Sequence, residues 1–137
     1  MDDCIFCKIA NGEIPSATIY EDDDFRVILD LGPAADGHAL VIPKKHYANI
    51  YEIPDELAGK AMIVAKKVVS YLKEALPCDG YNIVQNNGES AGQTVFHFHM
   101  HLIPRHKGDG VGVTWKPGSL TDETRDRILK LTEELRK

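Results

Sequence analysis

Three histidines alternate with apolar residues in one short run of the chain, His97-Phe98-His99-Met100-His101-Leu102-Ile103. Alternation with a period of two is typical of a β-strand, so the three imidazoles should share one face, which we expect to be wet. Imidazole serves as nucleophile, proton donor and metal ligand near neutral pH. The opposite face should anchor the strand in the core through four apolar side chains, Phe96, Phe98, Met100 and Leu102.

A catalytic role for this run has two simpler alternatives: surface histidines without a function, and a single metal site held by all three. One histidine on the solvent side of a strand commonly has no function, but three in register, out of six in the chain, are hard to explain in that way. One metal ion held by all three conflicts with strand geometry, because same-face neighbours lie about 6.8 Å apart and the outer pair about 13.6 Å. Zinc–nitrogen bonds are only about 2 Å long, although two adjacent histidines could share an ion. We therefore expect the three imidazoles to have different roles.

Cys4 and Cys7 form a C-x2-C pair near the start of the chain, whereas Cys78 stands alone after a proline. A thioredoxin-like redox motif follows a strand and opens a helix, and too few residues precede Cys4 for such a strand. Three cysteines in a reducing compartment also predict no disulfide framework. Redox chemistry is therefore the weaker interpretation of this pair.

The whole chain has 137 residues, of which 43% are hydrophobic, and a formal charge of -5. This length predicts one domain. The acidic balance argues against nucleic-acid binding, and no segment has the roughly 18 continuous apolar residues that a membrane helix needs. Without a signal-peptide pattern at the N-terminus, we expect a cytoplasmic protein.

The elements that must position the histidines follow from hydrophobic periodicity and turn signals. The sequence predicts a central strand over 39–42 that is buried on both faces, and a long helix over 54–76 bounded by prolines. The other predicted elements are a short helix over 4–10, a hairpin of strands 18–21 and 25–29, a strand over 81–85 and a final helix capped by Thr121. With the histidine strand, this is an α+β domain: a mainly antiparallel five-stranded sheet with one long helix and a C-terminal helix, the helices lying on one side.

The histidine run resembles the motif of the histidine triad (HIT) family of nucleotide hydrolases and transferases, His-φ-His-φ-His-φ-φ with φ apolar. Further segments that match the family, and within it the Hint-like and bacterial HIT proteins, follow in order along the chain: Cys4–Ile9, Asp30, Gly37–Lys44 and Asn87–Val95. The similarity covers nearly everything from Cys4 to Arg105, and it implies a HIT-like fold. It also implies a domain core over 4–106 and a C-terminal extension of the same domain, a loop plus a helix, over 107–137.

The resemblance implies that a purine nucleotide or nucleotide conjugate binds with its α-phosphate at the histidines. His99 is then the nucleophile that takes the nucleotidyl group, and His101 donates a proton to the leaving group or a hydrogen bond to a phosphate oxygen. A neutral imidazole suits attack on an anionic phosphate, and its far nitrogen needs an acceptor such as a backbone carbonyl to hold the tautomer. His38, a fourth histidine, would orient this pair, unless it is only a hydrogen-bonded core residue.

The resemblance also implies nucleotide-binding roles outside the triad. Asp30 matches an acid that binds the ribose, although on its own it would be interpreted as a turn residue. Gly92, Gln93 and Thr94 would supply backbone amides and side-chain donors to the phosphate, because glycine permits close backbone approach. Asn86 matches a phosphate-side or leaving-group contact, with Gln85 and Asn87 as rivals. Candidates for a base pocket, each of which could equally be core, are Ile5, Phe6, Phe25, Ile28 and Leu31.

Some members of the family bind a structural zinc ion through a cysteine pair and two histidines, which map here to Cys4, Cys7, His46 and His97. Two thiolates and two imidazoles make a closed tetrahedral site, which suits structure better than catalysis. An unmetallated thiol pair is the alternative. No P-loop, Rossmann glycine pattern or magnesium-binding acidic pair is present, so we expect no catalytic metal.

Three classes of function remain open at this point. The first is a hydrolase that releases AMP or GMP from nucleoside 5'-phosphoramidates, with a dinucleoside polyphosphate (Ap4A-type) hydrolase as its rival within the family. The second is a nucleotide-binding adaptor protein with incidental catalysis, and the third is a zinc-stabilised interaction module with an idle triad. The resemblance further implies a two-fold homodimer.

Overall fold

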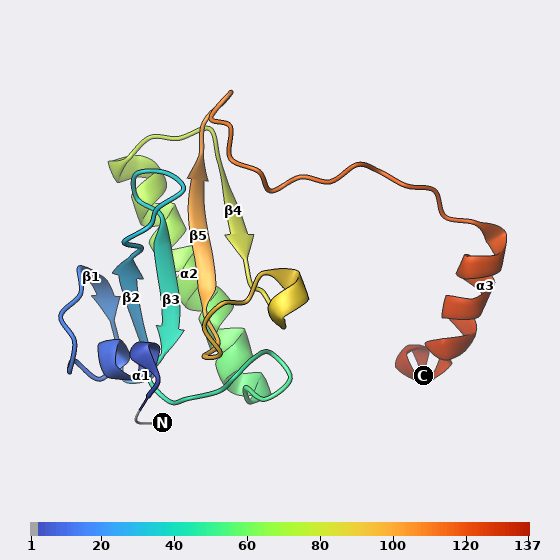
Figure 1. Cartoon of the computed structure of the whole chain (residues 1–137), viewed down its shortest axis with the longest axis horizontal. Coiled ribbons are helices and arrows are strands. Elements are labelled where there is room, and N and C mark those ends of the chain that lie inside the picture. The colour runs from blue at the N-terminus through green and yellow to red at the C-terminus, as the bar shows by residue number, and fades with distance from the viewer. Residues whose placement is uncertain (1–2) are drawn as a thin grey trace.

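The computed structural model describes residues 3–137 and contains one five-stranded antiparallel sheet (Figure 1). The strands, in the spatial order β1-β2-β3-β5-β4, are β1 (Thr18–Glu21), β2 (Phe25–Leu29), β3 (Ala39–Pro43), β5 (Met100–Arg105) and β4 (Gly80–Val84). The helices are α1 (Ile5–Ala10), α2 (Asp55–Ala75) and α3 (Asp122–Leu131), with short 3-10 turns at Glu89–Ala91 and Glu133–Arg136. The predicted α+β class and the five-stranded antiparallel sheet are confirmed.

The central strand β3 is buried along its whole length, as its apolar run predicts. Successive side chains of a strand point to opposite faces, so β3 contributes to two separate apolar clusters. Ala39 and Val41 pack in the larger cluster with α2, whereas Leu40 and Ile42 pack in the smaller one with α1. Both faces of the middle of the sheet are therefore closed to water.

The long helix α2 covers one face of the sheet. It begins directly after Pro54, which is the N-cap and not a residue of the first turn, and it ends at Ala75, before Pro77. Four small or branched side chains at helical spacing form its buried stripe: Ala61, Val64, Ala65 and Val68. Burying each valine stabilises the fold by about 1.5–3 kcal/mol, so this stripe fixes the helix on the sheet.

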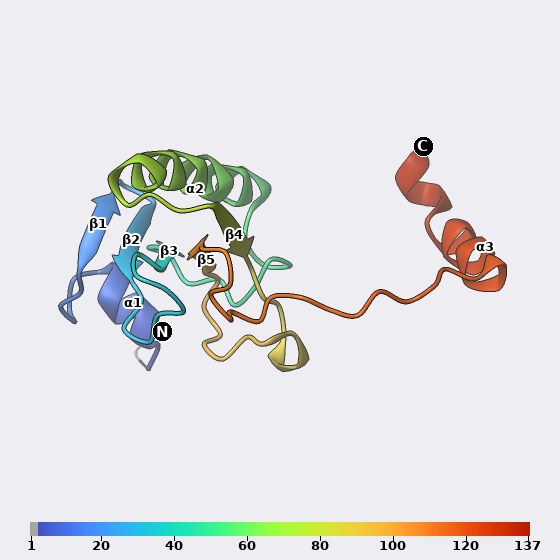
Figure 2. The ribbon, with the colours of Figure 1, turned by 90° about the horizontal axis from the view of Figure 1, so that it is seen from above.

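The short helix α1 lies on the opposite face of the sheet from α2 (Figure 2). The expectation that the helices lie on one side is therefore wrong. Its residues Phe6, Ile9 and Ala10 pack on Leu40 and Ile42, because β3 is apolar on both faces and its second face also needs cover. This packing brings the C-x2-C pair, which brackets the start of α1, to the face that carries the histidines.

The histidine run forms a strand only in its second half, so the prediction that all three histidines lie on one strand is wrong. β5 begins at Met100, and His97 and His99 belong to the segment before it. This segment turns towards the loop after β3, where the Phe98 N–H donates to the Tyr47 carbonyl at 2.6 Å. Phe96 is 52% exposed and does not anchor the core, whereas Phe98, Met100 and Leu102 are buried as predicted.

The chain after β5 runs away from the sheet to α3 (Figures 1 and 2). As predicted, Thr121 caps α3, with its hydroxyl accepting from the Thr124 N–H at 3.2 Å. No residue of α3 is buried, and several apolar side chains of this segment are exposed, including Trp115, Leu120 and Leu131. Within residues 3–137, no helix is long and apolar enough to span a bilayer.

Candidate functional site

The histidines of the site lie on the α1 face of the sheet. His101 of β5 pairs with Leu40 of β3, and His38 precedes β3 by one residue, so both side chains share the face of Leu40. The expectation of a wet face is wrong, because α1 covers it: His97 is fully buried and His99 is 6% exposed. The ring edge of Phe6, from α1, meets the His99 ring at 4.9 Å between centroids. The imidazoles therefore act in a protected environment.

His99 is held in one tautomer by the backbone. Its Nδ1 lies 2.7 Å from the carbonyl oxygen of His97, and because a carbonyl can only accept, Nδ1 carries the proton. Nε2 then carries the lone pair. Burial lowers the pKa of His99, so the ring stays neutral at pH 7. The predicted backbone acceptor for the far nitrogen is confirmed, and Nε2 presents a lone pair on a neutral ring.

A chain of hydrogen bonds fixes the tautomers of His38 and His101. The Ala34 N–H donates to His38 Nδ1 at 2.9 Å, so the His38 proton sits on Nε2. That Nε2 lies 3.0 Å from His101 Nδ1 and 3.5 Å from a carboxylate oxygen of Asp30. His101 Nδ1 therefore accepts, and its own proton is on Nε2. Sequence reasoning missed the part played by Ala34, because a backbone amide leaves no signal in the residue type.

Burial lowers the pKa of His101 to about 4, with the neighbouring His99 and His38 acting in the same direction. It also lowers the pKa of His38, which the Asp30 carboxylate only partly opposes. Both rings are neutral at pH 7, and the free donor of the pair is the His101 Nε2–H. An oxygen of a bound phosphate could accept a hydrogen bond from this N–H.

The loop before the histidine segment brings Asn86 and Gly92 together. Gly92 has a φ of +98°, and a Cβ built on it would lie 3.3 Å from the Asn86 side-chain nitrogen. The positive φ favours glycine here, and any larger residue would crowd the Asn86 side chain. Among residues 3–137 the Asn86 amide has no hydrogen-bond partner, whereas its rivals Gln85 and Asn87 bond to each other at 2.6 and 2.9 Å. Of the three amides, Asn86 is the one free to meet a ligand.

Gln93 is placed differently from the expectation of a phosphate donor. Its side chain is 2% exposed, and its Oε1 accepts from the Gly88 N–H at 2.9 Å. Its Nε2 donates to the carbonyls of Ala48 and Val95 at 2.6 and 3.1 Å. All these partners are backbone groups, so the side chain ties the loop to the segment after β3. Thr94, by contrast, is exposed.

The apolar candidates for a base pocket separate into core and surface. Phe25 and Ile28 are buried in the two core clusters and are not available to a ligand. Leu31 is 99% exposed and Ile5 is also exposed, whereas Phe6 contacts His99. Only Phe6 both touches the candidate nucleophile and presents an apolar ring beside it.

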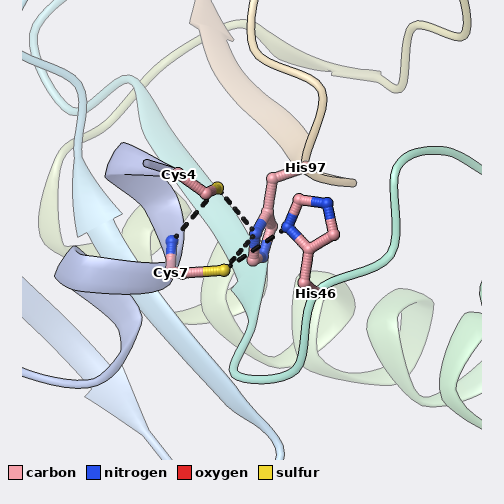
Figure 3. A group of neighbouring side chains, drawn as sticks. All are labelled: Cys4, Cys7, His46 and His97. Carbon is pink, nitrogen blue, oxygen red and sulfur yellow. Dashed lines mark hydrogen bonds between the residues drawn. The ribbon is translucent and has the colours of Figure 1, made fainter. Parts of the chain in front are cut away.

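The cysteine pair and two histidines form a compact cluster next to this site (Figure 3). His97 Nδ1 lies 3.3 Å from Cys4 Sγ and 3.4 Å from Cys7 Sγ, and His46 Nδ1 lies 3.4 Å from Cys7 Sγ. One ligand atom from each of the four residues lies within 4.8 Å of the others. The cysteines come from the start of α1, His46 from the loop after β3 and His97 from the segment before β5 (Figure 3).

These four side chains fit a zinc ion. In a tetrahedral site with Zn–S bonds near 2.3 Å and Zn–N bonds near 2.0 Å, sulfur and nitrogen lie about 3.5 Å apart, close to the distances here. His97 Nε2 donates to the Pro43 carbonyl at 2.8 Å, which leaves the lone pair on Nδ1, facing the thiols. Burial raises the pKa of the Cys7 thiol, a cost that a bound cation would reverse. Cys4, Cys7 and Cys78 form no disulfide.

Comparisons with known proteins agree with this geometry. A family model described as the HIT domain matches residues 11–108. Protein hit of Bacillus subtilis is 49% identical over 116 residues, which cover 84% of this chain and 80% of the relative. The adenosine 5'-monophosphoramidase HNT1 of Saccharomyces cerevisiae is 47% identical over 133 residues, which cover 96% of this chain and 80% of the relative.

Solved structures are similar over almost the whole chain. A crystal structure of a HIT family protein from Bacillus anthracis matches with a TM-score of 0.90 and 40% identity, covering 99% of both chains. A zinc-bound histidine triad family protein from Mycobacterium smegmatis matches with a TM-score of 0.78 and 36% identity. That match covers 98% of this chain and 96% of the other.

Proposed function

The chain belongs to the HIT domain family, and from that premise we propose that it is a nucleotide hydrolase that acts at an α-phosphate through a nucleotidyl intermediate on His99. The observation that carries the proposal is the hydrogen bond from His99 Nδ1–H to the His97 carbonyl. It leaves the Nε2 lone pair on a buried, neutral ring. Such a ring attacks an anionic phosphate without charge repulsion and without a separate base.

In the first step, His99 Nε2 forms a bond to phosphorus while the bond from phosphorus to the leaving group breaks. The neutral His101 donates its Nε2–H as a hydrogen bond to the leaving group or to a phosphate oxygen, and the leaving group takes its proton from solvent. His38 holds His101 in this tautomer by donating to its Nδ1 at 3.0 Å. In the second step, a water molecule attacks phosphorus, the bond to His99 Nε2 breaks, and the proton of the water is released to solvent. His38 acts through His101 and is a positioning residue.

The nucleotide would be held by groups around this pair. Asp30 Oδ1 accepts from the Gly32 N–H, and its second oxygen lies 3.5 Å from His38, so the carboxylate is held in one orientation. Its remaining lone pairs would accept the ribose hydroxyls. The unpartnered Asn86 amide supports a contact on the phosphate or leaving-group side. The backbone of Gly92 and the exposed Thr94 complete the proposed phosphate contacts, while Gln93 would act by holding this loop.

A nucleoside 5'-phosphoramidate is the substrate class that we favour, because the yeast relative is named an adenosine 5'-monophosphoramidase. Release of AMP or GMP follows from attack at the α-phosphate. A dinucleoside polyphosphate would be cleaved through the same His99 intermediate with a different leaving group, so it is the second candidate. An adaptor protein with incidental catalysis would bind the nucleotide but turn it over slowly.

Cys4, Cys7, His46 and His97 would hold a structural zinc ion. The distances of the cluster and the zinc-bound relative from M. smegmatis support this proposal. When bound, the ion would cross-link α1 to the segments that follow β3 and precede β5, and it has no open ligand position for chemistry. The His97 carbonyl orients His99, so the ion would also steady the backbone behind the nucleophile. Three free thiols are compatible with a reducing, cytoplasmic location.

We further propose a homodimer in which residues 107–137, an extension of the 4–106 domain, pack on a second copy. Trp115 is 83% exposed, and Leu120 and Leu131 are also exposed on a segment that runs away from its own sheet (Figure 1). Apolar side chains gathered on such a segment favour a partner surface.

The proposed activity is tested by incubating the protein with adenosine 5'-phosphoramidate or with diadenosine tetraphosphate and measuring AMP release. Faster release from the phosphoramidate is expected. His99→Asn should lower turnover by several orders of magnitude while AMP still binds, because the variant lacks only the nucleophilic nitrogen. His106→Asn is the matched control, since His106 is exposed and lies after β5. Equal turnover by His99→Asn and the control would exclude His99 as the nucleophile.

A further inference from the structure

Asp30, His38 and His101 have the spacing of a second metal site. One ligand atom from each lies within 4.8 Å of the others. His38 Nε2 is 3.0 Å from His101 Nδ1 and 3.5 Å from Asp30 Oδ2. In a tetrahedral zinc site with bonds near 2.0 Å, nitrogen and oxygen ligands lie about 3.3 Å apart. The two separations from His38 are therefore close to those between ligands of one cation.

Only one of the three ligand atoms is unsuited to a cation. Asp30 presents a carboxylate oxygen, and His101 Nδ1 carries a lone pair because it accepts from His38. His38 Nε2 instead carries a proton, since the Ala34 N–H donates to Nδ1 at 2.9 Å. A neutral imidazole that binds a metal through Nε2 must carry its proton on Nδ1. In this site the proton on His38 Nδ1 would face the Ala34 N–H, so two hydrogen-bond donors would oppose each other.

The cysteine-containing cluster shows the opposite arrangement. There a backbone carbonyl, that of Pro43, accepts from His97 Nε2, and the lone pair is left on the nitrogen that faces the thiols. At His38 a backbone amide takes the lone pair on Nδ1, and the proton is left on the nitrogen that faces Asp30 and His101. The two clusters have similar distances, so the backbone group behind each histidine distinguishes them.

We propose that Asp30, His38 and His101 form a second, weaker site for zinc or a similar divalent cation, and that the Ala34 N–H keeps its affinity low by holding the His38 proton on Nε2. On binding, the Nε2–H bond breaks, a proton is taken up from solvent on Nδ1, and the hydrogen bond from Ala34 is lost. An unpaired donor of this kind costs enough to weaken binding about tenfold to a hundredfold.

An occupied site would block the reaction, because the cation takes the His101 Nδ1 lone pair and the Asp30 oxygen that the nucleotide needs. This inhibitory consequence rests on the proposed function, whereas the site itself does not. Zinc binding is therefore measured directly, and turnover is a separate readout. The Ala34 N–H would then keep zinc from binding to His38 and His101, although the neighbouring cysteine-containing cluster would bind the same ion.

The test replaces the Ala34 N–H by an ester oxygen, with lactic acid incorporated at position 34 of the full chain. The same ester at position 35 is the matched control, because within residues 3–137 the Ala35 N–H has no hydrogen-bond acceptor. Zinc alone is titrated by equilibrium dialysis. Co²⁺ is the spectroscopic probe, since its thiolate bands report only Cys4 and Cys7. The ¹⁵N shifts of the His38 ring report its tautomer and the integrity of the site.

We expect the ester at position 34 to bind the second zinc about tenfold or more tightly than the natural chain and the control, without a change in the thiolate bands. Adding His38→Asn to this variant should abolish the second site. Inhibition of turnover should follow occupancy of the second site. Equal second-site affinity in the two esters, or a second ion that persists after His38→Asn, would overturn the proposal. Failure of turnover alone would count against the proposed activity and not against the metal site.

Discussion

Gln93 offers a test that separates two roles for one side chain. The sequence places it among donors to a phosphate, whereas the structure commits its amide to Gly88, Ala48 and Val95. If the structural role dominates, Gln93→Ala removes three buried hydrogen bonds, each worth about 1 kcal/mol net, and leaves a small void. We expect the free energy of unfolding to fall by about 3–4 kcal/mol, a large part of the stability of a domain of this size.

Urea unfolding at pH 7.5 measures this change. With an m-value near 2 kcal/mol/M, the midpoint should move by about 1.5–2 M. Glu89→Ala is the control on the same loop, because Glu89 is exposed and its side chain has no hydrogen-bond partner among the described residues; it should stay within about 0.5 kcal/mol. AMP release is measured on the same preparations below their unfolding midpoints.

Gln93→Glu keeps the shape of the side chain and changes only its donor. At pH 7 a carboxylate would face the carbonyls of Ala48 and Val95, so its pKa should rise and the fold should be destabilised at least as much as by alanine. Lowering the pH through that raised pKa should restore part of the stability, since the protonated acid donates one hydrogen bond. Stability unchanged in both variants, together with lost AMP release, would refute the structural role and favour the phosphate contact.

Four further predictions concern the histidines, the metal and the tail. Burial lowers the pKa of His97 and of His101 to about 4, so in metal-free protein these rings should not reduce the free energy of unfolding above pH 6.5. Between pH 6.5 and 4 that free energy should fall by up to about 1.4 kcal/mol per pH unit for each ring, because the unfolded chain then binds more protons. Urea unfolding across this range measures the change, and a free energy independent of pH would contradict the prediction. Cys7→Ser should lower bound zinc, measured by elemental analysis, and reduce the melting temperature, whereas Cys78→Ser should do neither. His38→Asn should lower kcat more than it raises KM in AMP-release assays, because the ring orients His101; a change in KM alone would place His38 in nucleotide binding. A chain that ends after Lys107 should sediment as a monomer, because it lacks the segment proposed to form the dimer. A truncated chain that still sediments with the mass of a dimer would contradict this prediction.

Elements with strong local signals could be predicted from the sequence. The strands 18–21 and 25–29 agree with the structure to the residue, and the acidic turn between them is closed by the Asp22 side chain, which accepts from the Asp24 and Phe25 N–H groups. The apolar run 39–42 predicts a central strand because four branched or small apolar residues in a row have no polar face to expose. Family membership is also confirmed, since the motif segments occur in order.

What could not be predicted depends on tertiary contacts. The alternation around His97 has the period of a strand, but hydrogen bonds to Pro43 and Tyr47 turn that segment away from the sheet before Met100. α1 is six residues long, and nothing in so short a pattern says which face of the sheet it covers. The groups that fix the imidazole tautomers could not be predicted either, because they are backbone carbonyls and amides, which every residue type carries. The cluster of Cys4, Cys7, His46 and His97 combines three segments, and only the resemblance could connect them.

The central claim is that His99 Nε2 carries the nucleotidyl group. It is tested most directly by stopping the reaction with adenosine 5'-phosphoramidate in alkali during steady-state turnover, digesting the protein and locating the adduct by mass spectrometry. We predict one adenylyl group, attached to His99 and absent from His99→Asn. An adduct on His101 or His97, or turnover at full rate with no adduct at any histidine, would contradict the claim.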